Sequence, residues 1–241
     1  MKNGNSLKCS VDHPILNLAF DNWEFKRADK LEVGDVVGLA PNVDYWGNTD
    51  NHNAYTIGYS LKDDLYNEKS IKDIRKFNKI STCKFLAGLF DSKGNIDTEN
   101  SIVLIMSNAN LLKEISLHLH KLGIFSIFKT LSKHKYALKI KDSICTFYKE
   151  IPVRKFSCDL SELNNEVLSE PIKCEIASIA HIGIQVVYNL QADYDNTYLA
   201  NGIITHNTKT DSILGSSFLG LTPIGLINGF GGKRAKKFGI D

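Results

Sequence analysis

Three consecutive residues near the C-terminal end, His206, Asn207 and Thr208, have side chains that can break and re-form a peptide bond. The side-chain amide of an asparagine can attack its own main-chain carbonyl, close a five-membered succinimide ring and cut the chain after itself. A histidine directly before it can polarise that carbonyl or protonate the leaving amine. A threonine directly after it offers a hydroxyl nucleophile. Elsewhere the same tripeptide is a common polar loop.

The residues before this triplet predict the element that holds it. Asn201 and Gly202 form a two-residue hairpin turn signal, and it stands between the apolar runs Tyr198–Ala200 and Ile203–Ile204. β-Branched residues favour strands. We therefore expect a hairpin whose second strand ends at His206, so that a sheet holds the reactive residues.

The segment from Val187 to Thr208 resembles the C-terminal splicing blocks of inteins. Those blocks read roughly Val-Tyr-Asp-Leu, a spacer, His-x-Phe, a pair such as Asn-Gly, an apolar run and His-Asn before Cys, Ser or Thr. Asn189 stands where the family usually has Asp, and Asn196 where it usually has His. Both family residues assist catalysis, so the resemblance gives Asn189 and Asn196 supporting positions and leaves more of the work to His206.

A second resemblance lies near the N-terminus. The run Lys8–Leu16 resembles the second N-terminal splicing block of inteins, with Ser10 in its Thr place and His13 in its His place. Trp23–Ala28 and Lys30–Val37 match the segment that follows that block. In the family this His polarises the upstream scissile peptide so that a Cys or Ser attacks it. The resemblance therefore implies that Ser10 and His13 favour an acyl shift there.

The family's first splicing block, which begins with that Cys or Ser, has no match before His13. Cys9 lies inside the second block, and we expect it to be a packed strand residue. Two explanations stay open. The chain is the C-terminal half of a split intein, with its N-terminal half and N-extein as partner, or the start of the reading frame has been lost. We favour the split because the chain begins with Met at the Asn3-Gly4 turn.

Composition bounds the remaining possibilities. The 241 residues are 43% hydrophobic and 23% charged, which allows one large core or two small ones. The five cysteines form no Cys-x-x-Cys pair, so the sequence predicts neither a zinc site nor a disulfide framework. A reducing, cytoplasmic setting is the expectation. The sequence has no run of 18 apolar residues, so we expect no membrane partner.

Charge divides the chain into two kinds of segment. Residues 53–157 carry 18 Lys and Arg against 10 Asp and Glu, a net of +8, whereas the remainder carries 11 against 17, a net of −6. A basic middle within an acidic frame indicates two domains with different partners. The basic domain is the candidate for contact with the phosphates of double-stranded DNA.

The middle segment carries its own motif. Thr82–Asp97 resembles the LAGLIDADG motif of homing endonucleases, whose first four letters are identical to Leu86-Ala87-Gly88-Leu89. Ala87 and Gly88 allow two helices to approach closely. The segment Tyr55–Asp64 is the best candidate for the partner helix. We interpret residues 53–80 as the remnant of a first repeat.

Periodicity after the motif predicts one αββαββα unit, the LAGLIDADG repeat. We expect strands at 95–98, 101–107, 124–131 and 135–141, and helices at 108–122 and 142–150. Five lysines cluster on the later strands, where they either contact phosphates or form a solvated face: Lys129, Lys133, Lys135, Lys139 and Lys141.

The nuclease chemistry of the motif is altered. The family's metal-binding carboxylate is the eighth letter, and that letter is Lys93 here; a cation cannot ligate Mg²⁺. Asp91 is the sixth letter, which is not the family's metal ligand. Asp63 takes the carboxylate place on the partner segment. We therefore expect a degenerate endonuclease that uses Mg²⁺ only if it is active.

Together these features predict an all-β Hint (horseshoe) domain, the fold of inteins, interrupted by an α/β LAGLIDADG-type αββαββα domain. Residues 1–52 and 158–207 are expected to form the Hint domain, 53–157 the insertion and 208–241 the C-extein. The expected activity is protein splicing in trans without a cofactor. The alternatives are an active site-specific DNA endonuclease, a self-cleaving Hint domain that does not ligate, and a basic DNA-binding protein with fortuitous matches.

Overall fold

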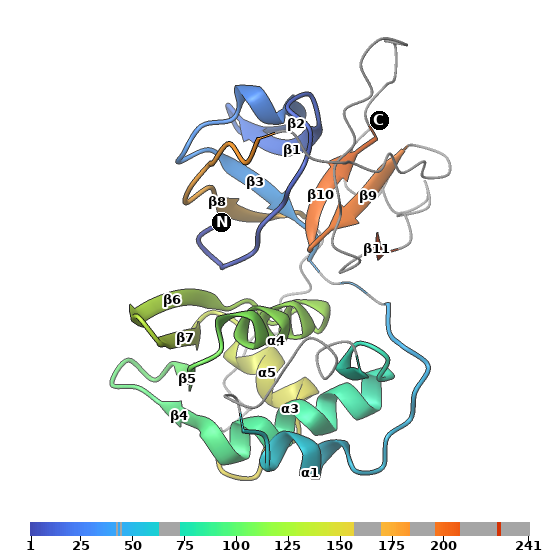
Figure 1. The fold of residues 1–241 in the computed structure, drawn as a ribbon, viewed down its shortest axis with the longest axis vertical. Coiled ribbons are helices and arrows are strands. Elements are labelled where there is room, and N and C mark those ends of the chain that lie inside the picture. The colour runs from blue at the N-terminus through green and yellow to red at the C-terminus, as the bar shows by residue number, and fades with distance from the viewer. Residues whose placement is uncertain are drawn as a thin grey trace. The chain divides into compact units, whose positions relative to one another are not determined.

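The computed structural model describes residues 1–41, 43, 45–62, 73–156, 170–183, 196–207 and 226–227. The chain divides into two compact units (Figure 1). Unit 1 comprises Met1–Pro41 and Leu168–Asp241, and unit 2 comprises Asn42–Val167. No helix in the described part of the chain is long and apolar enough to cross a membrane.

Unit 1 is built on a seven-stranded sheet of antiparallel pairs. Its strand order is β11-β9-β10-β1-β3-β8, with β2 also paired to β1. The strands are β1 (Pro14–Ala19), β2 (Asn22–Arg27), β3 (Val36–Leu39), β8 (Ile172–Glu175), β9 (Thr197–Ala200), β10 (Ile203–His206) and β11 (Leu226–Ile227), with one 3-10 turn, η1 (Ala28–Lys30). Strands from the two ends of the chain therefore share one sheet.

The hairpin predicted around Asn201 and Gly202 is confirmed. These residues have φ angles of 52° and 79°, as a primed two-residue turn requires. The turn joins β9 to β10 with Ile203 paired to Ala200 and His206 paired to Thr197. The second strand ends at His206, so the sheet holds His206 at a strand terminus, directly before Asn207.

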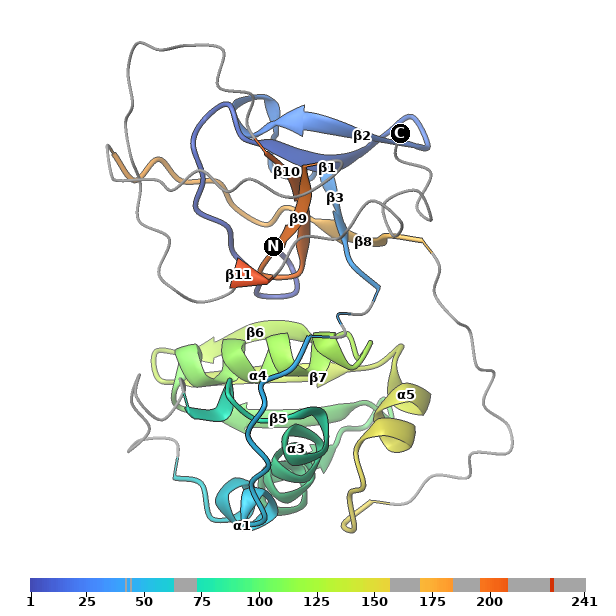
Figure 2. The ribbon, with the colours of Figure 1, turned by 90° about the vertical axis from the view of Figure 1, so that its right-hand side faces the viewer.

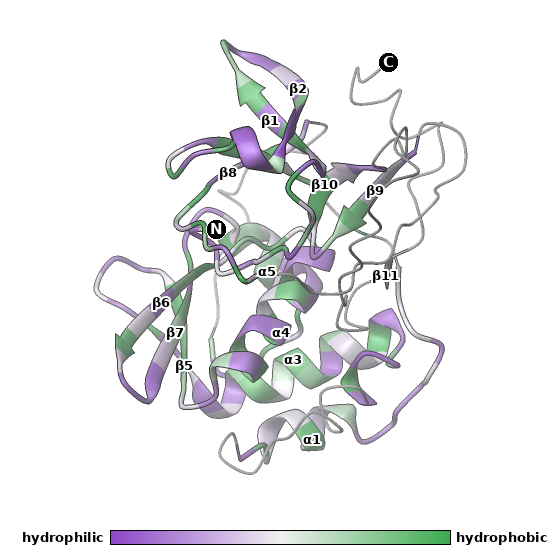
Figure 3. Cartoon of the chain, turned by 45° about the horizontal axis from the view of Figure 1, so that its top comes forward, coloured by the Kyte–Doolittle hydropathy of each residue, from purple (hydrophilic) through white to green (hydrophobic). Residues whose placement is uncertain are grey.

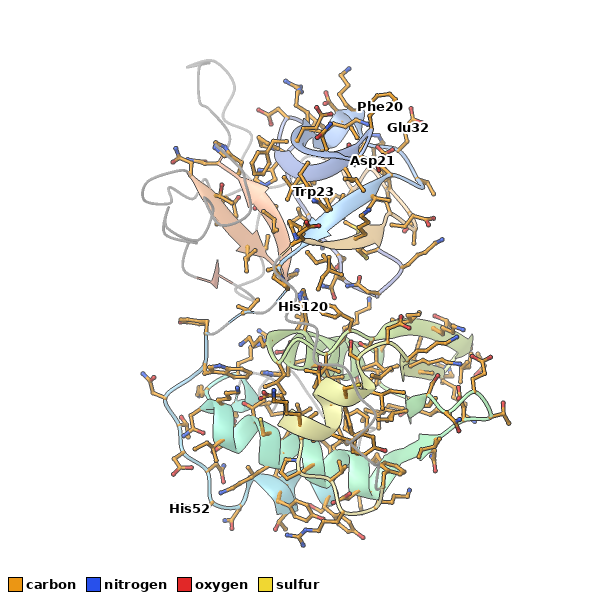
Figure 4. The ribbon with its side chains drawn as sticks, turned by 180° about the vertical axis from the view of Figure 1, so that it is seen from behind. Phe20, Asp21, Trp23, Glu32, His52 and His120 are labelled. Carbon is orange, nitrogen blue, oxygen red and sulfur yellow. The ribbon has the colours of Figure 1, made fainter. Side chains whose placement is uncertain are left out.

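The turn between β1 and β2 has the same two-residue geometry but less suitable residues. Phe20 and Asp21 also have positive φ angles, 48° and 65°, although neither is glycine or asparagine. Their side chains lie at this turn (Figure 4), and that of Phe20 is 100% exposed. A bulky residue in this conformation is an outlier, so this turn is strained.

Unit 2 has the helices and strands predicted for residues 82–150, and its motif helix begins three residues earlier, at Lys79. They are α3 (Lys79–Lys93), β4 (Gly94–Ile96), β5 (Ile102–Met106), α4 (Ala109–Lys121), β6 (Ile127–Ser132), β7 (Lys135–Ile140) and α5 (Ile144–Glu150), preceded by α1 (Ala54–Tyr59). The strands form a second antiparallel sheet in the order β4-β5-β7-β6. The predicted αββαββα order is confirmed.

Local signals explain the bounds of α4. The Asn108 side chain accepts a hydrogen bond from the Leu111 N–H and caps the first turn. Gly123 follows the helix with a φ of 74°. Hydrophilic and hydrophobic residues both occur along α4 (Figure 3). The apolar set, which includes Leu111, Ile115 and Leu119, is buried in the core of unit 2.

Two details differ from our expectations. Residues 45–52 pack with unit 2, because Gly47 and Thr49 donate main-chain hydrogen bonds to Phe77 and Lys76. The units therefore divide after Pro41 and not after residue 52. Residues 5–10 form no strand, so Cys9 is not a strand residue; it packs, half-buried, against the core of unit 1.

Candidate functional site

The sheet of unit 1 brings three strand ends to one place (Figure 2). Strand β10 pairs with β9 on one side and with β1 on the other, where Ile15 faces Thr205. Continuing that register by two residues places His13 beside Asn207. The start of β1, the end of β10 and the start of β9 thus form a common edge.

His206 contacts the carbonyl at which the chain would break. Its Nδ1 lies 2.8 Å from the main-chain oxygen of Asn207. An Nδ1–H that donates to this oxygen withdraws electron density from the carbonyl carbon and stabilises an oxyanion formed there. The imidazole is held by an edge-on contact with Phe25, with ring centroids 5.2 Å apart. Such a contact would make this carbon more susceptible to attack.

The main chain of Asn207 is fixed from its other side as well. Its N–H donates to the main-chain oxygen of Asn196 at 2.8 Å. Asn196 has a φ of 56°, a conformation that asparagine tolerates better than most residues. The contact that Asn196 makes with Asn207 is therefore a main-chain contact, and a supporting role for the Asn196 side chain stays a prediction.

The side chain of Asn207 has an unpaired oxygen. Among the described residues, its Oδ1 is buried and has no hydrogen-bond partner. An unpaired buried amide oxygen is costly. No hydrogen bond to Oδ1 therefore has to break before the Asn207 amide reacts.

His13 is buried, with 7% of its surface exposed. Burial lowers the pKa of His13 to about 4; the charge of Asp12 opposes the lowering and His206 adds to it. The ring is therefore neutral at neutral pH. Its Nε2 lies 3.3 Å from the hydroxyl of Tyr198. Sequence reasoning missed Tyr198 and Phe25; strand alternation alone was the available signal.

Ser10 and Cys9 lie just before His13. The main-chain oxygen of Ser10 accepts a hydrogen bond from the His13 N–H at 3.3 Å, closing a turn that leads into β1. Burial, with a contribution from Asp12, raises the pKa of the Cys9 thiol to about 11. A thiol that stays protonated is a weak nucleophile, which fits Cys9 as a packing residue.

Three of the predicted site residues fall outside the described part of the chain. They are Asp63, Asn189 and Thr208. The roles expected for them therefore remain predictions.

In unit 2, α1 and α3 run side by side in two views (Figure 1 and Figure 2). A Cβ atom on Gly88 would lie 2.0 Å from the main-chain oxygen of Tyr55, and one on Gly58 would lie 2.0 Å from that of Phe85. The two helices thus touch backbone to backbone through glycine. The close approach predicted for Gly88 and the partner segment predicted around Gly58 are both confirmed.

Asp91, near the end of α3, uses both carboxylate oxygens in hydrogen bonds within unit 2. Its Oδ1 accepts main-chain hydrogen bonds from Arg154 and Lys155 at 2.7 and 2.8 Å, and its Oδ2 accepts one from the Tyr55 hydroxyl at 2.9 Å. Lys93 follows two positions later, half-buried. Both oxygens of Asp91 are engaged and Lys93 is cationic, so these residues do not fit a Mg²⁺ site.

No group of three or more His, Cys, Asp or Glu able to hold a metal occurs among the residues with assigned positions.

The predicted lysine cluster on β6 and β7 divides into two sets. Lys139 bridges Asp97 and Glu99 at 2.7 and 2.8 Å, and Lys141 lies 3.9 Å from Glu99. Exposed members away from these acids are Lys129, Lys133 and Lys135.

The middle of the chain matches a known protein family. Residues 82–152 match the family model described as "LAGLIDADG-like domain". The chain contains a LAGLIDADG-like domain. The match begins in α3 and ends just after α5, so this domain supplies the second sheet and the helix that carries Gly88.

Three relatives are similar over larger or smaller parts. A DNA polymerase of Methanocaldococcus jannaschii is 25% identical over 182 residues, which are 67% of this chain and 11% of that protein. Variants of the homing endonuclease I-DmoI are 25% identical, covering 33% of this chain and 46% of theirs, with a TM-score of 0.31. I-DmoI in complex with DNA and Ca is 25% identical, covering 31% and 39%, with a TM-score of 0.28.

Proposed function

We propose that unit 1 is a Hint-type splicing domain and that the chain carries out intein-mediated protein splicing. The observation that carries the proposal is the 2.8 Å contact between Nδ1 of His206 and the main-chain oxygen of Asn207. It polarises the one carbonyl that the side chain of Asn207 can reach through a five-membered ring. Asn196 holds the same residue from the other side.

The proposed final cleavage needs only atoms of this chain. Nδ2 of Asn207 bonds to its own main-chain carbon and loses a proton. The bond from that carbon to the nitrogen of Thr208 breaks, and the leaving amine takes up a proton. His206 stabilises the oxyanion of the intermediate. The products are a C-terminal succinimide and a free amine on Thr208.

The earlier steps use the other half of the site. A Cys or Ser at the upstream junction attacks its preceding carbonyl and forms a thioester or ester, assisted by His13 and Ser10. The Thr208 hydroxyl then attacks that acyl group and displaces the thiol or alcohol. After Asn207 cyclises, the ester rearranges from oxygen to nitrogen to give a peptide bond. An N-terminal half supplied in trans remains our prediction for the partner.

The curated relative supports this proposal. The match covers 67% of this chain but 11% of a DNA polymerase. An intein is an insertion in a larger host protein, and this proportion is what such an insertion would give.

The test is release of residues 208–241 from the purified full chain, followed by mass spectrometry. We expect an N-terminal fragment lighter by one water than simple hydrolysis would give. Asn207→Ala should abolish release, whereas Asn110→Ala, an exposed asparagine on α4, should not alter it. Equal release from Asn207→Ala would overturn the proposal. Release without any ligation to a complementary N-terminal half would instead favour the self-cleaving alternative.

We further propose that the LAGLIDADG-like domain binds double-stranded DNA without cutting it. The family match, the net charge of +8 over residues 53–157 and the exposed lysines of β6 and β7 support binding. The engaged oxygens of Asp91 and the cation at Lys93 argue against metal-dependent cleavage. An active endonuclease is the alternative.

Two measurements test this second proposal. Supercoiled plasmid with Mg²⁺ should stay uncut; linear product would show an active nuclease. Affinity for duplex DNA should fall with salt, and Lys129→Ala with Lys135→Ala should reduce the slope of log affinity against log salt by about 2. Lys113→Ala, on α4, is the matched control. Salt-independent affinity would contradict phosphate contact.

A further inference from the structure

We propose that Tyr198 is a positioning residue for His13: its hydroxyl donates a hydrogen bond to Nε2 and holds the imidazole in the Nδ1–H tautomer. This inference rests on the proposed splicing function, because it assigns Tyr198 to the upstream half of that site. Tyr198 takes part in no step of the cleavage at Asn207.

The sheet places the two side chains on one face. Tyr198 pairs with Thr205 across β9 and β10, and Thr205 pairs with Ile15 across β10 and β1. Directly paired residues share a face of a sheet, and so do residues two apart on a strand. His13, two before Ile15, therefore lies on the same face as Tyr198. The rings are tilted by 57°, with centroids 6.0 Å apart.

The hydroxyl reaches the imidazole directly. The distance from the Tyr198 oxygen to Nε2 of His13 is 3.3 Å, at the long end for such a bond, as catalytic hydrogen bonds often are before substrate is seated. The main chain of Tyr198 is anchored as well, because its carbonyl accepts a hydrogen bond from the Thr205 hydroxyl at 3.1 Å. Both partners are thus held by the sheet.

Chemistry decides the direction of this bond. The neutral imidazole of His13 has one nitrogen that accepts and one that donates. A phenol is a better donor than acceptor, because its oxygen lone pair is delocalised into the ring. Burial raises the pKa of Tyr198, so the hydroxyl keeps its proton. Nε2 of His13 therefore accepts, and the ring proton resides on Nδ1.

The tautomer matters for the upstream step. An Nδ1–H can donate to the scissile peptide and favour the acyl shift, whereas the opposite tautomer presents a lone pair there. Removing the Tyr198 hydroxyl should therefore slow the acyl shift and leave Asn207 cyclisation, which depends on His206, nearly unchanged.

The decisive experiment is nitrogen NMR of the full chain with ¹⁵N-labelled histidine at pH 7. Wild-type His13 should show a protonated Nδ1 and an unprotonated Nε2. Tyr198→Phe should shift its signals toward the other tautomer or a mixture, while Tyr136→Phe, which removes a hydroxyl from unit 2, should not. Unchanged His13 signals in Tyr198→Phe would overturn the inference.

Reaction rates separate this inference from the proposed function. With a complementary N-terminal half that begins with Cys, Tyr198→Phe should slow ligation about fivefold, the effect of about one lost hydrogen bond. Release of residues 208–241 should change less than twofold. Equal loss of both would show a merely structural role. Equal release from Asn207→Ala and wild type would instead refute splicing and leave the tautomer result standing.

Discussion

Nδ1 of His206 lies 2.8 Å from the main-chain oxygen of Asn207, so His206 contacts the carbonyl that the Asn207 side chain would attack in the proposed cleavage. Histidine and asparagine are adjacent in sequence, but this contact is not automatic. It exists because β10 ends at His206 and Phe25 of β2 packs against the imidazole.

The first prediction concerns that contact. His206→Ala should slow release of residues 208–241 by about 100-fold, within the range seen when one oxyanion donor is removed. His206→Gln keeps a donor and should lose less. Release is followed by mass spectrometry at fixed pH. A rate in His206→Ala equal to that of wild type would mean that the contact does not assist cleavage.

The second prediction concerns acid. The pKa of His13 is about 4 when folded, below the ordinary 6.5 of an exposed histidine. Between these values the unfolded state binds the proton and the folded state does not, so unit 1 should lose stability as pH falls from 6.5 to 4. The full loss is roughly 3 kcal/mol from this residue.

This loss can be measured by guanidinium unfolding at several pH values. The sequence has two tryptophans, so Trp46→Phe leaves Trp23 on β2 as the reporter for unit 1. His13→Gln in the same background should flatten the pH dependence. An unaltered slope in that variant would assign the acid sensitivity to another group.

The third prediction concerns the helix pair of unit 2. Gly88→Ala should destabilise this unit by about 3 kcal/mol or more, because the added methyl meets the main-chain oxygen of Tyr55, which cannot move aside. Ser92→Ala, exposed on the same helix, is the control. Trp23→Phe leaves Trp46 as the reporter. Similar unfolding midpoints for both variants would contradict the backbone-to-backbone contact.

The fourth prediction concerns the strained turn of unit 1. The double variant Phe20→Asn, Asp21→Gly should have a free energy of unfolding about 1 kcal/mol higher than wild type. Asparagine and glycine adopt positive φ angles easily, so the strain of this turn is removed. Trp23 fluorescence in denaturant measures the change. Phe20→Ala keeps the unfavourable conformation and should give little gain. A destabilised double variant would show that Phe20 makes a contact worth more than the strain.

Local chemistry in the sequence was sufficient for much of this architecture. The Asn201-Gly202 pair predicted its turn, Asn108 and Gly123 bounded α4, and periodicity ordered the strands and helices from 82 to 150. Such features depend on residues a few positions apart. The place of Gly88 in a helix contact could also be predicted, because only a small residue permits that approach.

Other features depend on strand pairing and loop packing across long separations. Tyr198 and His13 are 185 residues apart, and the register of β9, β10 and β1 brings them together. By sequence alone Asp91 is a carboxylate of the motif. In the structure it accepts hydrogen bonds from the main-chain N–H groups of Arg154 and Lys155.

The sequence by itself thus indicated which side chains have the chemistry for cleavage and determined the hairpin that leads to Asn207. Only the tertiary structure decided which groups His13 and Asp91 bond, because those partners are selected by sheet register and chain closure and not by the residues beside them in sequence.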